Sequence, residues 1–276
     1  MSERPSSFGL LLGQTQYQNK IFFRNPLAAF FTLFFPLMIF VVFALVFGNQ
    51  EIDYLGVTTA QYYAPSMAVF AAVSATYTNL AVTTAYQRDQ GILKRVRGTP
   101  LPSAVYMGGK IISAVMIATI AVLIMMVIGV VFYGVQIYAA TLASAIMTFI
   151  VGVASFAALG LLVAAVVSSG EAATAVTNAT LLPLAFFSGV FIVPSQDSPA
   201  WLDAVASFFP LKHFVEPFVS AFNPLTVGSG WNWVSLAYMV LWGLVAVFLA
   251  VRFFKWEAPT GGGGRSRRKK KASAAS

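Results

Sequence analysis

The stretch YQRDQGILKRVRGTPLP, from Tyr86 to Pro102, is a charged island between two long apolar runs, and it decides how the chain is arranged. Its basic residues are Arg88, Lys94, Arg95 and Arg97. A polar segment that is tethered by membrane spans at both ends lies in water beside the bilayer, and Lys and Arg are retained on the cytoplasmic side. The island is therefore predicted to face the cytoplasm.

A short helix is predicted inside this island. Gly is the usual residue at a helix end, so Gly91 ends the helix that arrives from the preceding apolar run. Ile92, Leu93 and Val96 then share one apolar side of the segment, and Pro100 ends it. A short, half-apolar helix at the membrane surface is a suitable binding site for a soluble partner protein. The residues expected to make or position that contact are Arg88, Asp89, Gln90, Gly91, Leu93, Lys94, Arg95, Arg97, Thr99 and Pro100.

The composition is that of an integral membrane protein. Of the 276 residues, 58% are apolar and 9% are charged, whereas a soluble domain has about 45–50% apolar and about 25% charged residues. The absence of cysteine excludes a disulfide framework, a thiolate metal site and a thiol nucleophile. The net charge of +8 follows membrane topology and does not indicate nucleic-acid binding.

Six apolar runs reach the length of about 20 residues that crossing the hydrocarbon core requires. The predicted spans are about 27–47, 62–85, 111–133, 138–167, 172–193 and 231–253. Residues 7–23 are expected to form a weakly amphipathic helix in the interface plane, with a loose polar tail as the alternative. The predicted fold is all-α, with one transmembrane domain over 1–256 and a flexible basic tail over 257–276.

The distribution of charge predicts the orientation. With both termini in the cytoplasm, all 17 Lys and Arg residues except Lys212 lie inside or at the inner interface. The acidic residues that fall outside are Glu51, Asp53, Asp197, Asp203 and Glu216. An odd number of spans would put the basic tail on the wrong side. We therefore expect a multi-pass protein of the cell membrane with both termini in the cytoplasm.

The long external stretch, Pro194 to Gly230, carries two apolar segments, Trp201–Phe209 and Phe214–Phe222. Each segment is too short to cross the bilayer, so a re-entrant hairpin of two short helices between spans five and six is predicted. Lys212 and Glu216 are four residues apart, which predicts a local ion pair on the second segment.

The sequence assembles no enzymatic site. The nearest approach to a phosphate-binding loop is Gly109-Lys110, but Ile111 stands where Ser or Thr is needed and Ala104 where the first Gly is needed. A single histidine, His213, excludes a histidine-based metal cluster. None of the six spans carries Asp or Glu. Because ionisable groups at membrane depth mark proton relays and ion pathways, their absence weighs against a carrier that is driven by a proton or sodium gradient. Because the spans hold no group that could couple transport to an ion gradient, the energy for transport is expected to come from a soluble partner protein that acts on the charged island.

Three motifs carry a resemblance to a known family. Arg24-Asn25-Pro26 precedes a span that contains Pro36, and Asp89 to Pro100 is similar to an acidic-x-Gly-x-Leu-basic-x-x-x-x-Thr-Pro loop. The third motif lies around the fifth span and the external hairpin and comprises Gly189, Pro194, Trp201, Pro210, His213 and Glu216. On these residues the chain resembles the membrane subunits of type-2 ABC exporters, in particular the drug-resistance permeases typified by the daunorubicin-resistance exporter.

The resemblance implies a transport complex. Two such subunits, expected to be identical, form the pathway, and each rests on a separate cytoplasmic ATP-binding subunit. ATP and magnesium would be bound by that partner, so this chain is expected to hold no cofactor or metal and not to be an enzyme itself. The N-terminal helix and the loop from Gly91 to Thr99 would transmit the motion. Gln90 departs from the family pattern, where many members carry a charged residue, and this would alter which ATPase is recognised.

The predicted function is export of an amphipathic small molecule, drug or antibiotic from the cytoplasm or the inner leaflet. A lipid-linked glycan is the second substrate class, and a gradient-driven carrier or channel is the alternative of a different class. Polar groups in spans prefer protein or water-filled cavities to lipid. Candidate path residues are Phe34, Phe35, Tyr77, Asn79, Asn178 and Phe187. The alternative is that the aromatic rings face lipid and the asparagines bond between helices.

Overall fold

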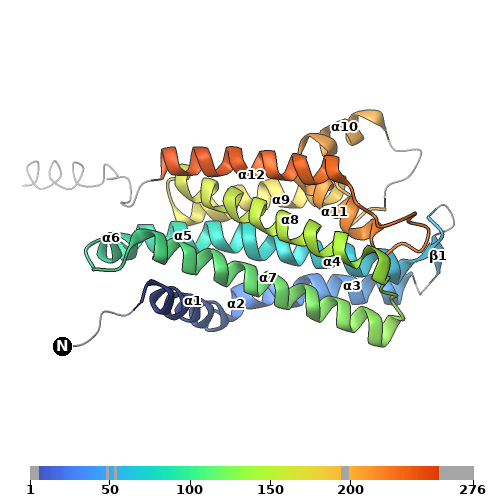
Figure 1. The fold of residues 1–276 in the computed structure, drawn as a ribbon, viewed down its shortest axis with the longest axis horizontal. Helices are drawn as coiled ribbons and strands as arrows, with labels where there is room; N and C mark the ends of the chain where they lie inside the picture. The colour runs from blue at the N-terminus through green and yellow to red at the C-terminus, as the bar shows by residue number, and fades with distance from the viewer. Residues whose placement is uncertain (1–5, 48–49, 53–54, 194–198, 255–276) are drawn as a thin grey trace, which may run out of the picture.

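The computed structural model describes residues 6–47, 50–52, 55–193 and 199–254, which form a bundle of long helices with a small two-stranded sheet at one end (Figure 1). We call the two ends of the bundle the α6 end and the α11 end. The elements are α1 (Ser7–Phe23), α2 (Pro26–Ala29), the π-helix η1 (Phe30–Phe34), α3 (Phe35–Val46), β1 (Glu51–Ile52), β2 (Val57–Thr58), α4 (Thr59–Val73), the π-helix η2 (Ser74–Thr78), α5 (Asn79–Asp89), α6 (Ile92–Arg97), α7 (Ser103–Tyr133), α8 (Ala139–Val166), α9 (Gly170–Phe187), α10 (Ala200–Phe208), α11 (Pro210–Ser220) and α12 (Trp233–Phe253).

Within the part of the chain that the structure describes, five helical segments are long and apolar enough to cross a membrane: Pro26–Val46, Thr59–Asp89, Ser103–Tyr133, Ala139–Val166 and Trp233–Phe253. They correspond to five of the six predicted spans, so the prediction of an all-α membrane protein is confirmed. The predicted fifth span falls on α9, which is not among them. This helix has 18 residues and carries Glu171, Asn178 and three threonines, which lower its hydropathy.

The path of the chain shows that α9 joins the two ends of the bundle. At its start, the Gly170 amide donates to Asp89 Oδ2 at 2.6 Å, beside α6. Just beyond its last turn, the Gly189 carbonyl accepts from the Tyr62 hydroxyl at 2.7 Å, near the start of α4. The helix α8 ends at the α6 end and α12 begins at the α11 end, so α9 carries the chain back from the α6 end to the α11 end (Figure 1). Six membrane crossings stay a prediction, which this path supports.

A π turn interrupts the first span directly ahead of Pro36. Proline lacks an amide N–H, so the preceding turn loses an ordinary helical hydrogen bond. The Phe35 amide bonds instead to the carbonyl of Phe30, five residues earlier. The turn, η1, lies against a second π turn, η2, in the next span. Such turns are rare and cluster at functional sites.

The second π turn is held by α8. The Asn79 amide bonds to the carbonyl of Ser74, and this widened turn pushes the carbonyls of Thr76 and Tyr77 toward Gly160 of α8. A Cβ at Gly160 would lie 2.7 Å from both carbonyl oxygens, which is closer than van der Waals contact allows. Glycine is therefore required where α8 crosses η2.

The centre of the bundle is α4, all of whose residues are buried. It packs against α3, α7, α8 and α11. The helix α11 contributes Leu211, Phe214 and Phe218 to the core, and the Phe214 ring occupies the space beside Gly152 of α8. The two predicted short helices are present as α10 and α11, although the second begins at Pro210 rather than at Phe214. Their re-entry into the membrane stays a prediction.

Candidate functional site

The segment between α5 and α7 is shaped by Gly91. Its backbone has φ 68° and ψ 13°, the left-handed conformation that glycine adopts without steric cost, and it separates α5 from α6. The predicted helix break at Gly91 is therefore confirmed. At the other end of α6, the Thr99 hydroxyl donates to the Val96 carbonyl at 2.7 Å, and Pro100 lies exposed in the turn that follows.

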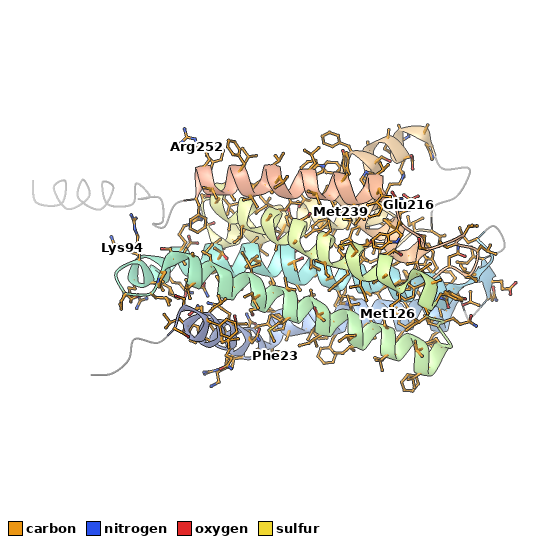
Figure 2. All side chains as sticks on the ribbon, in the orientation of Figure 1. Phe23, Lys94, Met126, Glu216, Met239 and Arg252 are labelled. Carbon is orange, nitrogen blue, oxygen red and sulfur yellow. The ribbon has the colours of Figure 1, made fainter. Side chains whose placement is uncertain are left out.

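The helix α6 has one inward and one outward side. Leu93 is fully buried and anchors the helix to the bundle. Lys94, Arg95 and Arg97 are exposed, and Lys94 projects from the bundle end (Figure 2). The Arg95 guanidinium donates to the Gln90 carbonyl at 3.2 Å and so stays close to the turn. The result is a basic surface on a short, anchored helix, as the sequence predicted.

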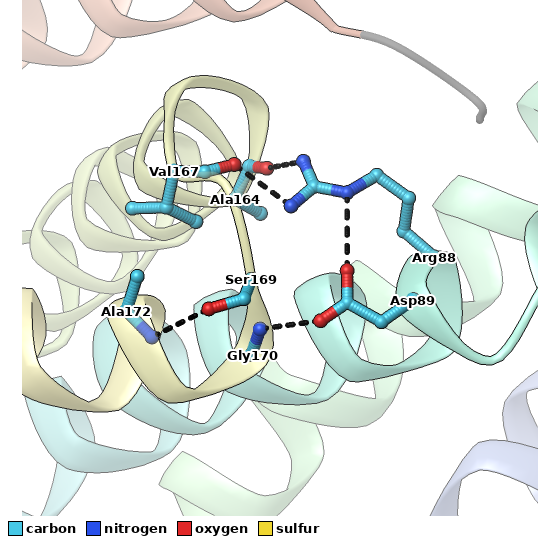
Figure 3. Close-up of polar contacts among 7 residues, drawn as sticks. All are labelled: Arg88, Asp89, Ala164, Val167, Ser169, Gly170 and Ala172. Carbon is cyan, nitrogen blue, oxygen red and sulfur yellow. Dashed lines mark hydrogen bonds and ion pairs between the residues drawn. The ribbon is translucent and has the colours of Figure 1, made fainter. Parts of the chain in front are cut away.

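The adjacent Arg88 and Asp89 fasten this segment to the turn between α8 and α9 (Figure 3). Arg88, only 3% exposed, donates to the carbonyls of Ala164 and Val167, each at 2.7 Å. Asp89 accepts from the Gly170 amide and lies 3.7 Å from the Arg88 Nε. The Arg88 cation thus lies at the C-terminus of α8, and the Asp89 anion lies at the N-terminus of α9. The helix dipole stabilises a positive charge at a C-terminus and a negative charge at an N-terminus. Arg88 is therefore a positioning residue behind α6, not part of its exposed surface.

Replacing Arg88 with methionine is expected to destabilise the chain by about 2–4 kcal/mol, because two buried carbonyls lose charged donors. The control is Arg97→Met, which removes an exposed arginine and is expected to change stability by less than about 0.5 kcal/mol. The midpoint of thermal unfolding in detergent measures both. Equal midpoints for the two variants would contradict this role of Arg88.

The N-terminal helix α1 docks beside this site. The Ser113 hydroxyl of α7 donates to Asn19 Oδ1 at 2.6 Å. A Cβ at Gly109 would lie 2.6 Å from Gln14 Cγ, so the glycine lets α1 approach α7 closely. The helix has the predicted bounds, and its position in the membrane interface stays a prediction. Its contact with α7 was not predicted from the sequence.

A buried lysine links α7 to α5 near the same end. Lys110 is 3% exposed, and its ammonium donates to Gln87 Oε1 at 2.5 Å. The Tyr106 hydroxyl donates to the same oxygen at 2.6 Å. Tyr106 and Lys110 are four residues apart on α7, so one helix face presents both. That spacing is the signal in the sequence from which the pair could have been predicted, whereas the motif around Lys110 indicated only an incomplete phosphate loop.

The six candidate path residues do not share one cavity. Phe187 lines a cavity at the α11 end, whereas Asn79 lines a separate one of about 30 Å³ beside α1. The Tyr77 hydroxyl is hydrogen-bonded to that of Thr180 in α9 at 2.8 Å, which is an interhelical bond of the kind that the alternative interpretation expects. Of the remaining residues, Phe34 and Asn178 are exposed and Phe35 packs against the core.

The candidate residues of the predicted external hairpin are dispersed at the α11 end. His213 hydrogen-bonds through its ring nitrogens to Ser235 Oγ at 3.2 Å and to the Ser207 carbonyl at 2.9 Å. Gly189 has φ 80°, Pro210 opens α11, and Trp201 of α10 is 62% exposed. Pro194 lies outside the described residues.

The predicted pair of Lys212 and Glu216 is wrong. The Lys212 ammonium instead bonds to the Asp203 carboxylate of α10, and it donates to Ser207 Oγ at 3.0 Å. The short connection at Phe209 brings α10 back against α11, so a partner on the neighbouring helix is nearer than the one on the next turn. Glu216 has no hydrogen bond or ion pair among the residues that the structure describes.

Comparison with known proteins decides the family. Residues 11–223 match the family model of the ABC-2 type transporter. The chain belongs to the ABC-2 type transporter family. The resemblance found in the sequence is therefore confirmed. Members of this family are membrane subunits of transporters, and they generally work with an ATP-binding partner subunit.

Individual relatives of this ABC-2 family member are transport permeases. The chain is 29% identical over 235 residues to the daunorubicin resistance ABC transporter permease protein DrrB1 of Streptomyces coeruleorubidus, covering 81% of this chain and 76% of that protein. It is 22% identical to the putative transport permease YvfS of Bacillus subtilis, covering 87% of this chain and 96% of that protein. It is 24% identical to the probable multidrug ABC transporter permease YbhR of Escherichia coli, covering 61% of this chain and 44% of that protein.

Proposed function

We propose that this chain is the transmembrane permease subunit of an ATP-driven exporter that moves an amphipathic small molecule, drug or antibiotic, outward from the cytoplasm or the inner leaflet. The observation that carries the proposal is α6, a short helix with Leu93 buried and a basic surface exposed at one end of the bundle. Membership of the ABC-2 family supports it. Two relatives whose names include daunorubicin resistance and multidrug transport support the substrate class.

In this proposal a separate cytoplasmic subunit binds ATP and magnesium and pushes on α6. The Arg88–Asp89 clamp makes α5, α8 and α9 move with α6, and α1 follows through its contact with α7. Two copies of this chain form the pathway. A cytoplasmic position of the α6 end and of both termini is supported by Lys94 and Arg252, which lie at that end, away from Glu216 (Figure 2).

The test is to isolate the tagged full chain from its native membrane, to assay the eluate for ATP hydrolysis, and to measure drug export in reconstituted vesicles. A co-eluting ATP-binding subunit and export that requires ATP would support the proposal. If the chain elutes alone, and transport stops when the proton gradient is collapsed with ATP still present, the chain is a gradient-driven carrier instead.

A further inference from the structure

A cavity of about 320 Å³ lies at the α11 end, between α4, α9, α10 and α11. Much of its wall is apolar and includes Phe186, Phe187, Leu202, Val215 and Val219. Small-molecule pockets have volumes of about 300–1,000 Å³, with mostly apolar walls and a few polar groups that fix the ligand's orientation. The cavity therefore has the size and lining of a site for a compact organic molecule.

Several polar groups on this wall already have partners. The Gln61 amide group donates to the carbonyls of Gln136 and Phe222 at 2.9 and 2.6 Å, and its oxygen accepts from the Gln136 amide at 2.8 Å. The Lys212 ammonium is paired with the Asp203 carboxylate. These groups shape the cavity, and binding a ligand through them would first require breaking their bonds.

One charged group on the wall is left for a ligand. Glu216 of α11 is exposed, and its carboxylate has no hydrogen bond or ion pair among the described residues. The Ser188 hydroxyl also lacks a hydrogen-bond partner among those residues, but its oxygen is buried, and a molecule in the cavity does not reach it. Because Lys212 neutralises Asp203, Glu216 supplies an unbalanced negative charge.

We propose that this cavity binds an amphipathic organic amine, whose ammonium group pairs with Glu216 and whose apolar body lies against Phe187 and Val215. A charge-assisted hydrogen bond to a carboxylate is roughly twice as strong as a neutral one, so the ammonium is recognised in preference to an alcohol or an amide. An organic anion would be repelled by Glu216.

The inference rests on the proposed function, because it narrows the exported molecule to a cation and gives it a site remote from α6. Figure 2 shows Glu216 far along the bundle from Lys94. If the α6 end is cytoplasmic, the cavity is at the external end, where a transported molecule would be held before it is released. Energy input and cargo recognition would then act at opposite ends of one subunit.

The test uses the purified full chain in lipid nanodiscs and two fluorescent probes, dansylcadaverine and its neutral N-acetyl derivative. We expect the amine to bind and the acetylated probe to bind at least about tenfold more weakly. Glu216→Gln, which removes the charge and keeps the shape, is expected to raise the Kd of the amine by about tenfold. Glu171→Gln, the same change at the α6 end of α9, is the matched control and should leave the Kd unchanged.

Equal binding of both probes, or wild-type affinity in Glu216→Gln, would overturn the proposal and leave Glu216 as a solvated surface carboxylate. Size-exclusion profiles of the variants establish that each is folded. The outcome is separable from the proposed function. Amine binding without an ATP-binding partner would refute the exporter and keep the site, whereas ATP-dependent export without amine binding would keep the exporter and refute the site.

Discussion

Reversing Arg95 and Arg97 to glutamate is expected to abolish co-purification of the ATP-binding subunit and ATP-driven export, without unfolding the permease. Both side chains are exposed on α6, so their replacement leaves the core intact. Truncating one member of a charge pair at a protein interface costs about 2–5 kcal/mol, and reversing two charges adds repulsion. The association constant should therefore fall by at least about a hundredfold.

The matched control reverses two basic residues elsewhere at the same end, Lys20 and Arg252, which are also exposed. The total change of charge is identical, so a general electrostatic effect would appear in both double variants. We expect only the α6 variant to lose its partner in the pull-down and in the ATPase assay of the eluate. If it keeps both, the assignment of α6 as the docking helix is wrong.

The features that the sequence predicted are those that local chemistry controls. The length of an apolar run determines whether a helix can span the bilayer, and five of the predicted spans are identified from length and composition alone. The left-handed turn at Gly91 follows from the residue type. The split between buried Leu93 and exposed Lys94 follows from helical periodicity. In each case, neighbours in sequence carry the necessary information.

The features that it missed depend on backbone atoms and on distant segments. Arg88 donates to the carbonyl oxygens of Ala164 and Val167. Every residue has a backbone carbonyl, so the residue type does not reveal which carbonyls will accept such a bond. The cavity near Glu216 is assembled from segments between residues 55 and 223, which no local pattern relates. Asp203 competes for Lys212 only once α10 folds back against α11. Tertiary packing decided each of these contacts.

The second large effect is expected at Gly160, where α8 crosses the π turn η2. Replacing this glycine with valine places a Cβ 2.7 Å from the carbonyl oxygens of Thr76 and Tyr77. Because the opposing atoms are backbone, they cannot turn aside as the end of a flexible side chain could. Overpacking of this kind costs about 1–3 kcal/mol or more. We expect the midpoint of thermal unfolding to fall by at least about 5 °C.

Gly13→Val provides the comparison, since Gly13 is an exposed helical glycine of α1, and a Cβ added there would have no neighbouring atom within 4 Å. That variant should unfold at or slightly above the wild-type temperature, because valine has the higher helix propensity. The valine at position 160 also separates α8 from η2, and Tyr77 of η2 is bonded to Thr180 of α9. Export should therefore fall even below the unfolding temperature. Equal stability of the two variants would mean that α8 does not press on the π turn.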